Sequence, residues 1–218
     1  MNKTALFLSL SSILMVTASC QKNPDFDQLS DNFMVYTNYD KNVTFSQYST
    51  FYIPDTIQIL GSSKVTNWIG TASGQPDGDA NAEKIIKTVS TNLINCGYTQ
   101  ITDPAIRKTA DLGMQLFYVE NTYYVTSYST PYYWYDWWWG GSWAPGWECG
   151  YPTYASTYNY KIGSLLGEMI WINQTAKTLN PIWSFYITGS LSGSTYNDIQ
   201  RTVNGVEQAF KQSPYLNK

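Results

Sequence analysis

Asp136 and Glu148 are the two carboxylates in an otherwise uncharged, aromatic stretch of the chain, residues 123–154. Paired carboxylates serve as general acid and general base, or as acid and nucleophile, when they flank a glycosidic bond. Indole rings beside them would stack on a sugar ring. The sequence does not fix the separation of the two acids. A carboxylate-dependent hydrolase, most simply a glycosidase, is therefore kept as an alternative function.

The chain contains no histidine. Its absence excludes Ser-His-Asp and Cys-His hydrolases, histidine-ligated zinc and histidine acid–base catalysis. Asp77 and Asp79 precede an expected helix, where acidic residues cap the first turn and favour its positive end. Together with Asn81 they are only faintly like a calcium loop, because the later bidentate glutamate is missing. We therefore predict no catalytic residue, no metal site and no cofactor.

The aromatic segment (residues 123–154) has 14 aromatic residues among its 32, and six of the nine tryptophans of the chain lie between Trp134 and Trp147. Such rings stack on sugars, form hot spots in protein contacts, and collect at lipid headgroups. They would equally serve to cover an open face of a sheet. These four interpretations remain open. The candidate binding residues are Tyr132, Tyr133, Trp134, Trp137, Trp138, Trp139, Trp143 and Trp147.

Residues 1–19 have the layout of a bacterial lipoprotein signal peptide. Lys3 precedes an apolar run that is shorter than the about 20 residues of a membrane-spanning helix. Ala18-Ser19-Cys20 resembles a lipobox, in which the cysteine is lipidated and becomes the mature N-terminus, although Thr17 stands where leucine is usual. We predict lipidation at Cys20, where acyl chains such as palmitate would hold the protein on a membrane.

Gln21 follows the predicted lipidation site, in place of the aspartate that retains lipoproteins in the inner membrane. This favours the outer membrane, on either its periplasmic face or the cell surface. Residues 20–32 are polar and acidic and are expected to form a tether. The mature chain, residues 20–218, has a net charge of −4 and lacks the basic surface of a nucleic-acid binder.

Cys96 and Cys149 are the remaining cysteines. An oxidising envelope permits a disulfide between them, which would tie the aromatic segment to the end of a helix. The alternative is two unpaired thiols, with Cys96 as a small buried side chain.

The hydrophobic pattern predicts one α+β domain over residues 33–218. Apolar residues at helical spacing indicate a first helix that Asp79 caps and Gly97 closes in the left-handed conformation, and a second helix at residues 196–211. Strands are expected at residues 33–39, 46–53, 57–60, 110–125, 158–172 and 182–191. We predict two layers, a largely antiparallel sheet with both helices packed on one face.

Several motifs together resemble the bacterial lipoproteins of domain of unknown function family 4136. They are the strand pair at residues 35–40 and 45–51, Cys96-Gly97-Tyr98, Ala110-Asp111-Leu112, the hairpin of residues 160–165 and 181–184, and the terminal residues 208–216. The resemblance implies a lipid-anchored α+β envelope domain. It implies no activity, cofactor or catalytic residue.

The sequence therefore predicts a lipid-anchored envelope lipoprotein with a structural or binding role and no enzymatic activity. Its partners would be the membrane, through the lipid, and an envelope protein or a glycan, but not nucleic acid. The first alternative is a glycan-binding surface lipoprotein that uses the Trp and Tyr cluster.

Overall fold

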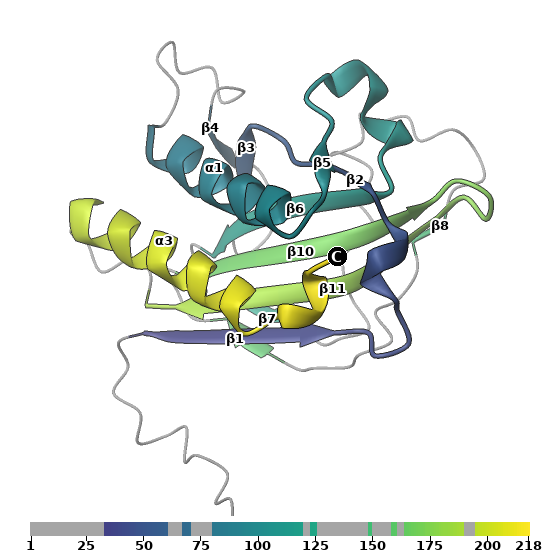
Figure 1. The fold of residues 1–218 in the computed structure, drawn as a ribbon. Coiled ribbons are helices and arrows are strands. Elements are labelled where there is room, and N and C mark those ends of the chain that lie inside the picture. The colour runs from purple at the N-terminus through teal and green to yellow at the C-terminus, as the bar shows by residue number, and fades with distance from the viewer. Residues whose placement is uncertain are drawn as a thin grey trace, which may run out of the picture. The chain divides into compact units, whose positions relative to one another are not determined.

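The computed structural model describes residues 33–60, 67–70, 80–119, 123–125, 148–149, 158–160, 164–189 and 195–218 (Figure 1). The predicted signal peptide, the lipidation site Cys20 and the tether lie outside these residues.

Nine strands of the described part form one sheet. They are β1 (Met34–Tyr39), β2 (Thr50–Tyr52), β3 (Thr56–Leu60), β4 (Asn67–Gly70), β5 (Thr99–Gln100), β6 (Leu112–Val119), β8 (Glu148–Cys149), β10 (Ser164–Asn173) and β11 (Thr178–Thr188). The order is β1-β11-β10-β6-β2-β5, with β3 also beside β6, β4 beside β3 and β8 beside β11. A separate antiparallel pair consists of β7 (Tyr123–Val125) and β9 (Tyr158–Tyr160). The centre, β1-β11-β10-β6, is antiparallel throughout.

Helices α1 (Ala80–Asn95) and α3 (Thr195–Lys211) lie side by side on one face of the sheet (Figure 1). The predicted apolar stripes are the ones buried. In α1 they are Ala82, Ile85, Val89 and Leu93, with the fifth predicted member, Ile86, half-buried; in α3 they are Ile199, Val203, Val206 and Phe210. The predicted two-layer α+β architecture, mostly antiparallel, is confirmed.

Gly97 ends α1 as the sequence predicted, with a φ of 97°. Its N–H donates to the carbonyl of Ile94 (2.9 Å), and the N–H of Tyr98 donates to the carbonyl of Leu93 (3.2 Å). This is the Schellman arrangement, which satisfies carbonyls that the helix end would otherwise leave unpaired.

The strand predicted at residues 46–53 is only partly present. Its first half is the 3₁₀ helix η1 (Phe45–Gln47), and only β2 remains as strand. Phe45, Tyr48 and Phe51 are all buried, and a spacing of three residues suits a 3₁₀ turn better than the alternation of a strand. Pro54 then separates β2 from β3, because it lacks the N–H of a ladder bond. Both strands run parallel to β6.

The predicted hairpin is formed by β10 and β11, whose register shifts by a bulge between Met169 and Ile170. At its turn, Asn173 Oδ1 accepts hydrogen bonds from the N–H groups of Thr175 and Ala176. Lys177 then adopts a φ of 53°. Two further 3₁₀ helices are η3 (Pro104–Thr109) and η4 (Pro214–Leu216).

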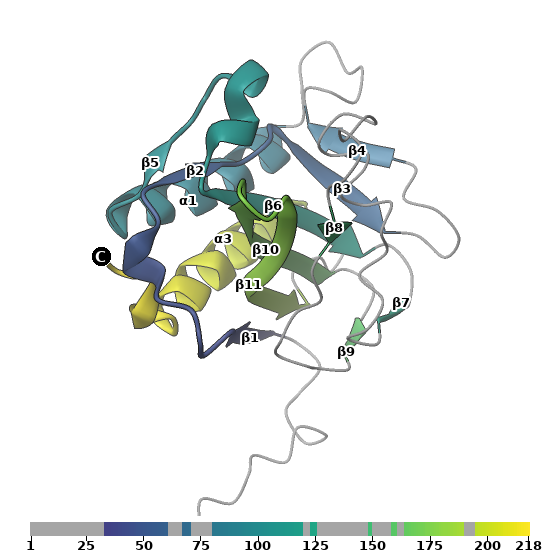
Figure 2. The same cartoon turned by 90° about the vertical axis from the view of Figure 1, so that its right-hand side faces the viewer.

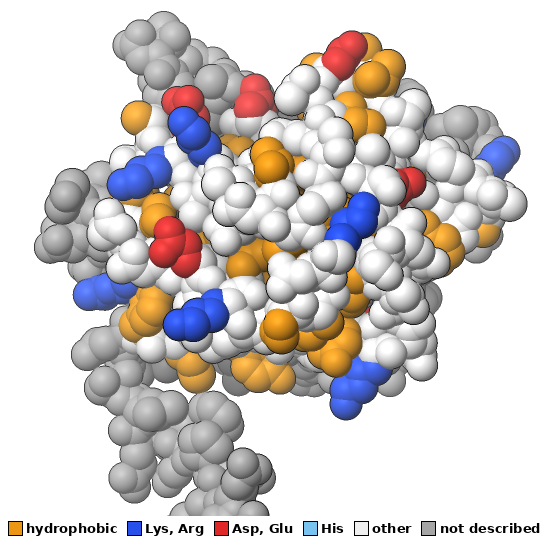
Figure 3. Space-filling view, viewed as in Figure 1, with side chains coloured by type: hydrophobic (Ala, Val, Ile, Leu, Met, Phe, Trp, Pro, Cys, Tyr) orange, Lys and Arg blue, Asp and Glu red, His pale blue; other side chains and the backbone are white. Residues whose placement is uncertain are grey.

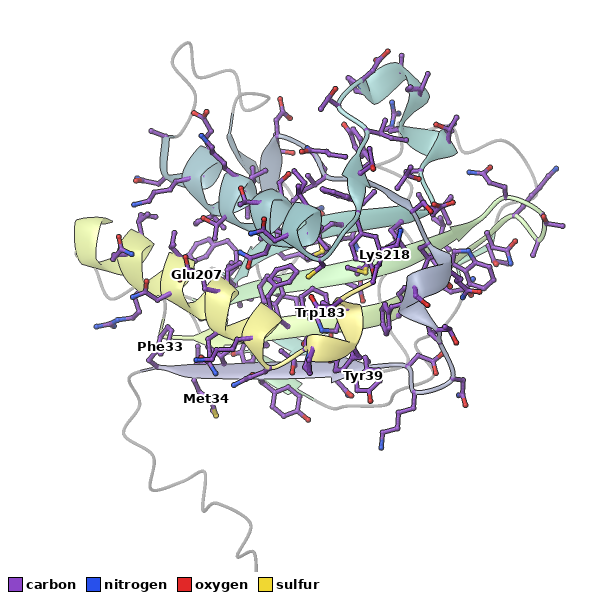
Figure 4. All side chains as sticks on the ribbon, in the orientation of Figure 1. Phe33, Met34, Tyr39, Trp183, Glu207 and Lys218 are labelled. Atoms are coloured by element: carbon purple, nitrogen blue, oxygen red, sulfur yellow. The ribbon has the colours of Figure 1, made fainter. Side chains whose placement is uncertain are left out.

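The C-terminal residues pack onto the core at Trp183, which is fully buried beneath α3 and η4 (Figure 4). Its indole N–H donates to Ser213 Oγ (3.0 Å), and the Tyr215 hydroxyl donates to the same oxygen (3.0 Å). The ring of Tyr215 stacks on that of Tyr39 in β1, with centroids 3.8 Å apart. The last turn therefore ties the first strand to the centre of the sheet.

Gly167 in β10 provides the space that the ring of Phe185 fills. A Cβ at position 167 would lie 2.2 Å from Phe185 Cε1 and 2.8 Å from Met114 Cε. The structure shows a close approach of side chains from the strands on both sides.

We expect Gly167→Ala to lower the free energy of unfolding by about 1–3 kcal/mol, because the added methyl group overpacks a filled core. Urea denaturation followed by circular dichroism measures the change. Met169→Leu, a volume-conserving change in the same strand, is the control and should cost less than about 1.5 kcal/mol. An unchanged midpoint for Gly167→Ala would contradict the close approach.

Candidate functional site

The predicted binding residues, Tyr132 to Trp147 with Asp136 among them, lie outside the described residues. Glu148 and Cys149 are described as β8, a short parallel pairing with Thr178 and Leu179 of β11. The proposed acid pair of Asp136 and Glu148 therefore stays a prediction. What the structure describes is how the two ends of the aromatic segment are held.

The antiparallel register of β6 with β10 continues into β7 and β9, the strands that lead into and out of the aromatic segment. Val119 of β6 pairs with Ser164 of β10, and Tyr123 of β7 pairs with Tyr160 of β9. On each of the two strands, the second pair lies four residues from the first. The pairing runs on to Val125 and Tyr158. These strands correspond to the long ones predicted at residues 110–125 and 158–172. The two ends of the segment thus leave the sheet together, as an antiparallel ribbon.

The ribbon lies on the side of the sheet away from the helices. Figure 2, which views the sheet edge-on, shows α1 and α3 on its left and β7 and β9 on its right. The segment is held a second time by β8, which pairs with the first residues of β11 next to the hairpin turn. Since the ribbon leaves near Ser164 and β8 lies near the far end of β10, these two points are about 30 Å apart along the strand.

The face of the sheet away from the helices is buried at its centre. Phe117 and Val119 of β6 and Ile170 of β10 are fully buried there, as are the residues that face the helices. Neither helix reaches this face. The centre of the sheet is therefore buried on both faces.

A row of polar side chains crosses this face. Asn38, Ser184, Glu168 and Gln115 pair in register across β1, β11, β10 and β6. Gln115 Nε2 donates to Glu168 Oε2 (2.8 Å). Gln115 was not singled out from the sequence. The available signal was a polar residue in the middle of an otherwise apolar strand.

Two carbonyl oxygens on this face lack a partner. Among the described side chains, Gln115 Oε1 and Gln58 Oε1 are buried without a hydrogen bond. The two glutamines lie on adjacent strands, since Gln58 pairs with Phe117, two residues beyond Gln115. An unmet buried acceptor costs about 1–3 kcal/mol. Each of these two oxygens can accept a hydrogen bond from a donor placed on this face.

Asp111, part of one of the resemblance motifs, has a structural role. Its Oδ2 accepts hydrogen bonds from the N–H groups of Ser49 (2.8 Å) and Thr50 (2.9 Å) and from the Thr50 hydroxyl (3.0 Å). Its carbonyl accepts from the N–H of Ile172 (2.8 Å). The carboxylate therefore aligns the start of β2 with the start of β6.

Cys96 is a free thiol in the structure, whereas the side chain of Cys149, its possible disulfide partner, lies outside the described part. The thiol is half-buried at the end of α1, and burial raises its pKa. The backbone at this helix end is bonded to a residue far along the chain, since the N–H of Lys218 donates to the carbonyl of Cys96 (3.1 Å).

Within the described ranges, no group of three or more acidic or cysteine side chains is placed to hold a metal ion. Among the helices that the structure describes, none has the length and apolar character needed to cross a membrane.

We expect Asp111→Ala to lower the free energy of unfolding by about 2–3 kcal/mol, because hydrogen bonds to a charged acceptor are lost from two backbone donors. Asp103→Ala is the matched control. Asp103 is exposed and its Oδ1 accepts one hydrogen bond, from the N–H of Ala105, so its loss should cost about 1 kcal/mol. Equal losses in urea denaturation would show that Asp111 does not align the two strands.

Comparison with known proteins identifies the family. The family described as "Domain of unknown function (DUF4136)" matches residues 35–215. A DUF4136 family protein from Bacteroides thetaiotaomicron VPI-5482, solved as a crystal structure, is 35% identical with a TM-score of 0.64, and the match covers 86% of this chain and 98% of that chain.

Two other solved structures are more distant. The PelC dodecamer from Paraburkholderia phytofirmans is 11% identical, with 85% of this chain and 99% of that chain covered and a TM-score of 0.37. A PDZ domain protein from Parabacteroides distasonis ATCC 8503 is 13% identical, with 83% and 36% covered and a TM-score of 0.34. Neither likeness is close enough to support an argument. No curated protein matches the chain. The match over residues 35–215, together with the similar crystal structure, shows that the chain belongs to the DUF4136 family.

Proposed function

We propose that the protein is a lipid-anchored lipoprotein of the cell envelope, in the outer membrane, with a structural or binding role and no enzymatic activity. Cys20 carries the lipid, and residues 20–32 tether the domain that starts at Phe33. The support for the anchor is the signal-like sequence of residues 1–19 and the lipobox-like Ala18-Ser19-Cys20. Acyl chains on one cysteine hold a protein to a membrane without a spanning helix.

The observation that carries the binding role is the ribbon formed by β7 and β9. It holds both ends of the aromatic segment together at one end of the sheet, and β8 fixes the segment again near the other end. The sequence of a segment inserted in this way can change without a change in the strand order of the domain. Tryptophan and tyrosine, which dominate it, are the side chains most enriched in binding hot spots.

Asp111, the carboxylate with the most hydrogen bonds described above, is engaged in aligning strands. The contact surface on this proposal is the aromatic segment, and its ligand is an envelope protein or a glycan.

Replacement of the lipidated cysteine tests the anchor. We expect Cys20→Ser to move the protein from the membrane fraction to the soluble fraction, because the acyl chains are lost. Cys96→Ser, at a cysteine inside the domain, is the matched control and should leave the protein in the membrane fraction. Fractionation and immunoblotting measure both. Membrane attachment of Cys20→Ser would refute the lipid anchor.

Replacement of four tryptophans tests the contact surface. We expect a variant with Trp134, Trp137, Trp138 and Trp139 changed to Ala to keep a cooperative melt and to lose retention on isolated envelope glycans or envelope proteins. Which of the two fractions loses retention identifies the ligand class.

Trp183→Ala gives the contrasting control. This ring is fully buried in the core, so its loss should cost about 3–5 kcal/mol of stability. If the fourfold variant loses its melt as Trp183→Ala does, the four rings belong to the core and the proposed surface is wrong.

A further inference from the structure

Strand β1 forms an open edge of the sheet. It pairs with β11 on one side, and among the described strands nothing pairs with its other side. Figure 1 shows β1 as the outermost strand beyond β11. Natural sheets protect such edges with charges, prolines or bulges, because an open edge pairs readily with another strand. The six residues of β1, Met-Val-Tyr-Thr-Asn-Tyr, include neither a charge nor a proline, and their pairing with β11 has no bulge.

The direction of the free backbone groups follows from the ladder. The N–H of Asp40 donates to the carbonyl of Ile182 (2.9 Å), which continues the β1–β11 register. In an antiparallel pair the bonded residues alternate. The even-numbered residues of β1 therefore bond to β11, and Val35, Thr37 and Tyr39 direct their N–H and C=O groups outward.

The outward groups differ in how they are satisfied. The N–H of Tyr39 donates to its neighbour Asn38 Oδ1 (2.9 Å), which closes that end of the edge. Within the described part of the chain, the outward backbone groups of Val35 and Thr37 have no hydrogen-bond partner. Two N–H donors and two C=O acceptors on the outer edge of β1 can therefore pair with another strand.

Apolar side chains accompany the open edge. Phe33 is 41% exposed and Tyr36 is 40% exposed, and they are two of the four large hydrophobic residues exposed in the described part of the molecule. Figure 3 shows hydrophobic side chains along the lower margin of the molecule, where β1 lies. A partner strand would cover these rings while it paired the backbone.

We propose that β1 pairs with β1 of a second copy of this chain, antiparallel and about a two-fold axis at Tyr36. In this register Val35 exchanges hydrogen bonds with Thr37 of the second copy, and Thr37 with Val35, so the open groups are satisfied in both chains. Tyr36 faces the same residue of the second copy in a non-hydrogen-bonded pair, where Cβ atoms lie about 4.5 Å apart. Each exposed ring covers the other.

The choice of a second copy rests in part on the proposed lipid anchor. A pair of short strands buries less than the about 1,200 Å² of a stable complex in solution, so it needs a high local concentration. The lipid at Cys20 would confine all copies to one membrane, and the tether enters the domain at Phe33, directly before β1. In the antiparallel pair the two tethers start about 20 Å apart, and each spans up to about 40 Å, so both lipids reach one membrane.

Cysteine cross-linking in the intact envelope tests the pairing. Tyr36→Cys should shift the full-length, lipidated protein from the monomer to the dimer position on a non-reducing gel of the membrane fraction, because the two cysteines face each other. Met34→Cys is the register control. It lies on the same face and edge, but its neighbour in the pair is Asn38 of the second copy, so it should stay monomeric. Ile94→Cys, exposed on α1, reports random collisions.

The outcomes separate the alternatives. A dimer of Tyr36→Cys above both controls supports the pairing, and a monomer in the membrane fraction overturns it. Equal dimers from Met34→Cys overturn the register, and an adduct of another mass shows that a different protein occupies the edge. The double variant Cys20→Ser with Tyr36→Cys tests the anchor separately. If this double variant stays with the membrane, the proposed anchor fails, whereas the gel of the single variant Tyr36→Cys still decides the pairing.

Discussion

The burial of the central strands on both faces is the constraint on which the rest of the structure depends. Two helices cover one face of β6, β10 and β11, and a sheet of this kind could leave the other face to water. Here Phe117, Val119 and Ile170 are fully buried on that second face. The central strands are therefore enclosed on both faces, and the ribbon of β7 and β9 lies on the second side.

Much of the architecture could be predicted because it follows from the local periodicity of apolar residues. The stripes of α1 and α3, the left-handed Gly97 and the β10–β11 hairpin each follow from residues close in sequence. The beginning of the strand predicted at 46–53 was wrong, because Phe45 and Tyr48 are buried at a spacing that a 3₁₀ turn satisfies. The alternation of nearby residues hid that spacing.

Features that depend on distant residues could not be predicted. The parallel pairing of β2 and β3 with β6, and the hydrogen bonds of Asp111 to Ser49 and Thr50, bring together residues far apart in sequence. The polar row through Gln115 and Glu168 depends on a strand register that no local pattern fixes. Whether Cys96 and Cys149 form a disulfide could not be predicted for the same reason, since composition permits the pair but only the distance and geometry between the two cysteines decide it. The aromatic segment was recognised from composition, and the strands at both its ends from alternation.

The stacking of Tyr215 on Tyr39 has a consequence for the order of events during biosynthesis. β1 is the first described strand to be made, yet Met34 pairs with Thr188, and Tyr39 stacks on Tyr215. Contacts of such long sequence separation form late, because the intervening chain must be made and ordered first. The newly made β1 must therefore wait, unpaired, until β11 and the residues up to Tyr215 have been synthesised. Chaperones that bind extended apolar segments would find their target at this end of the nascent chain.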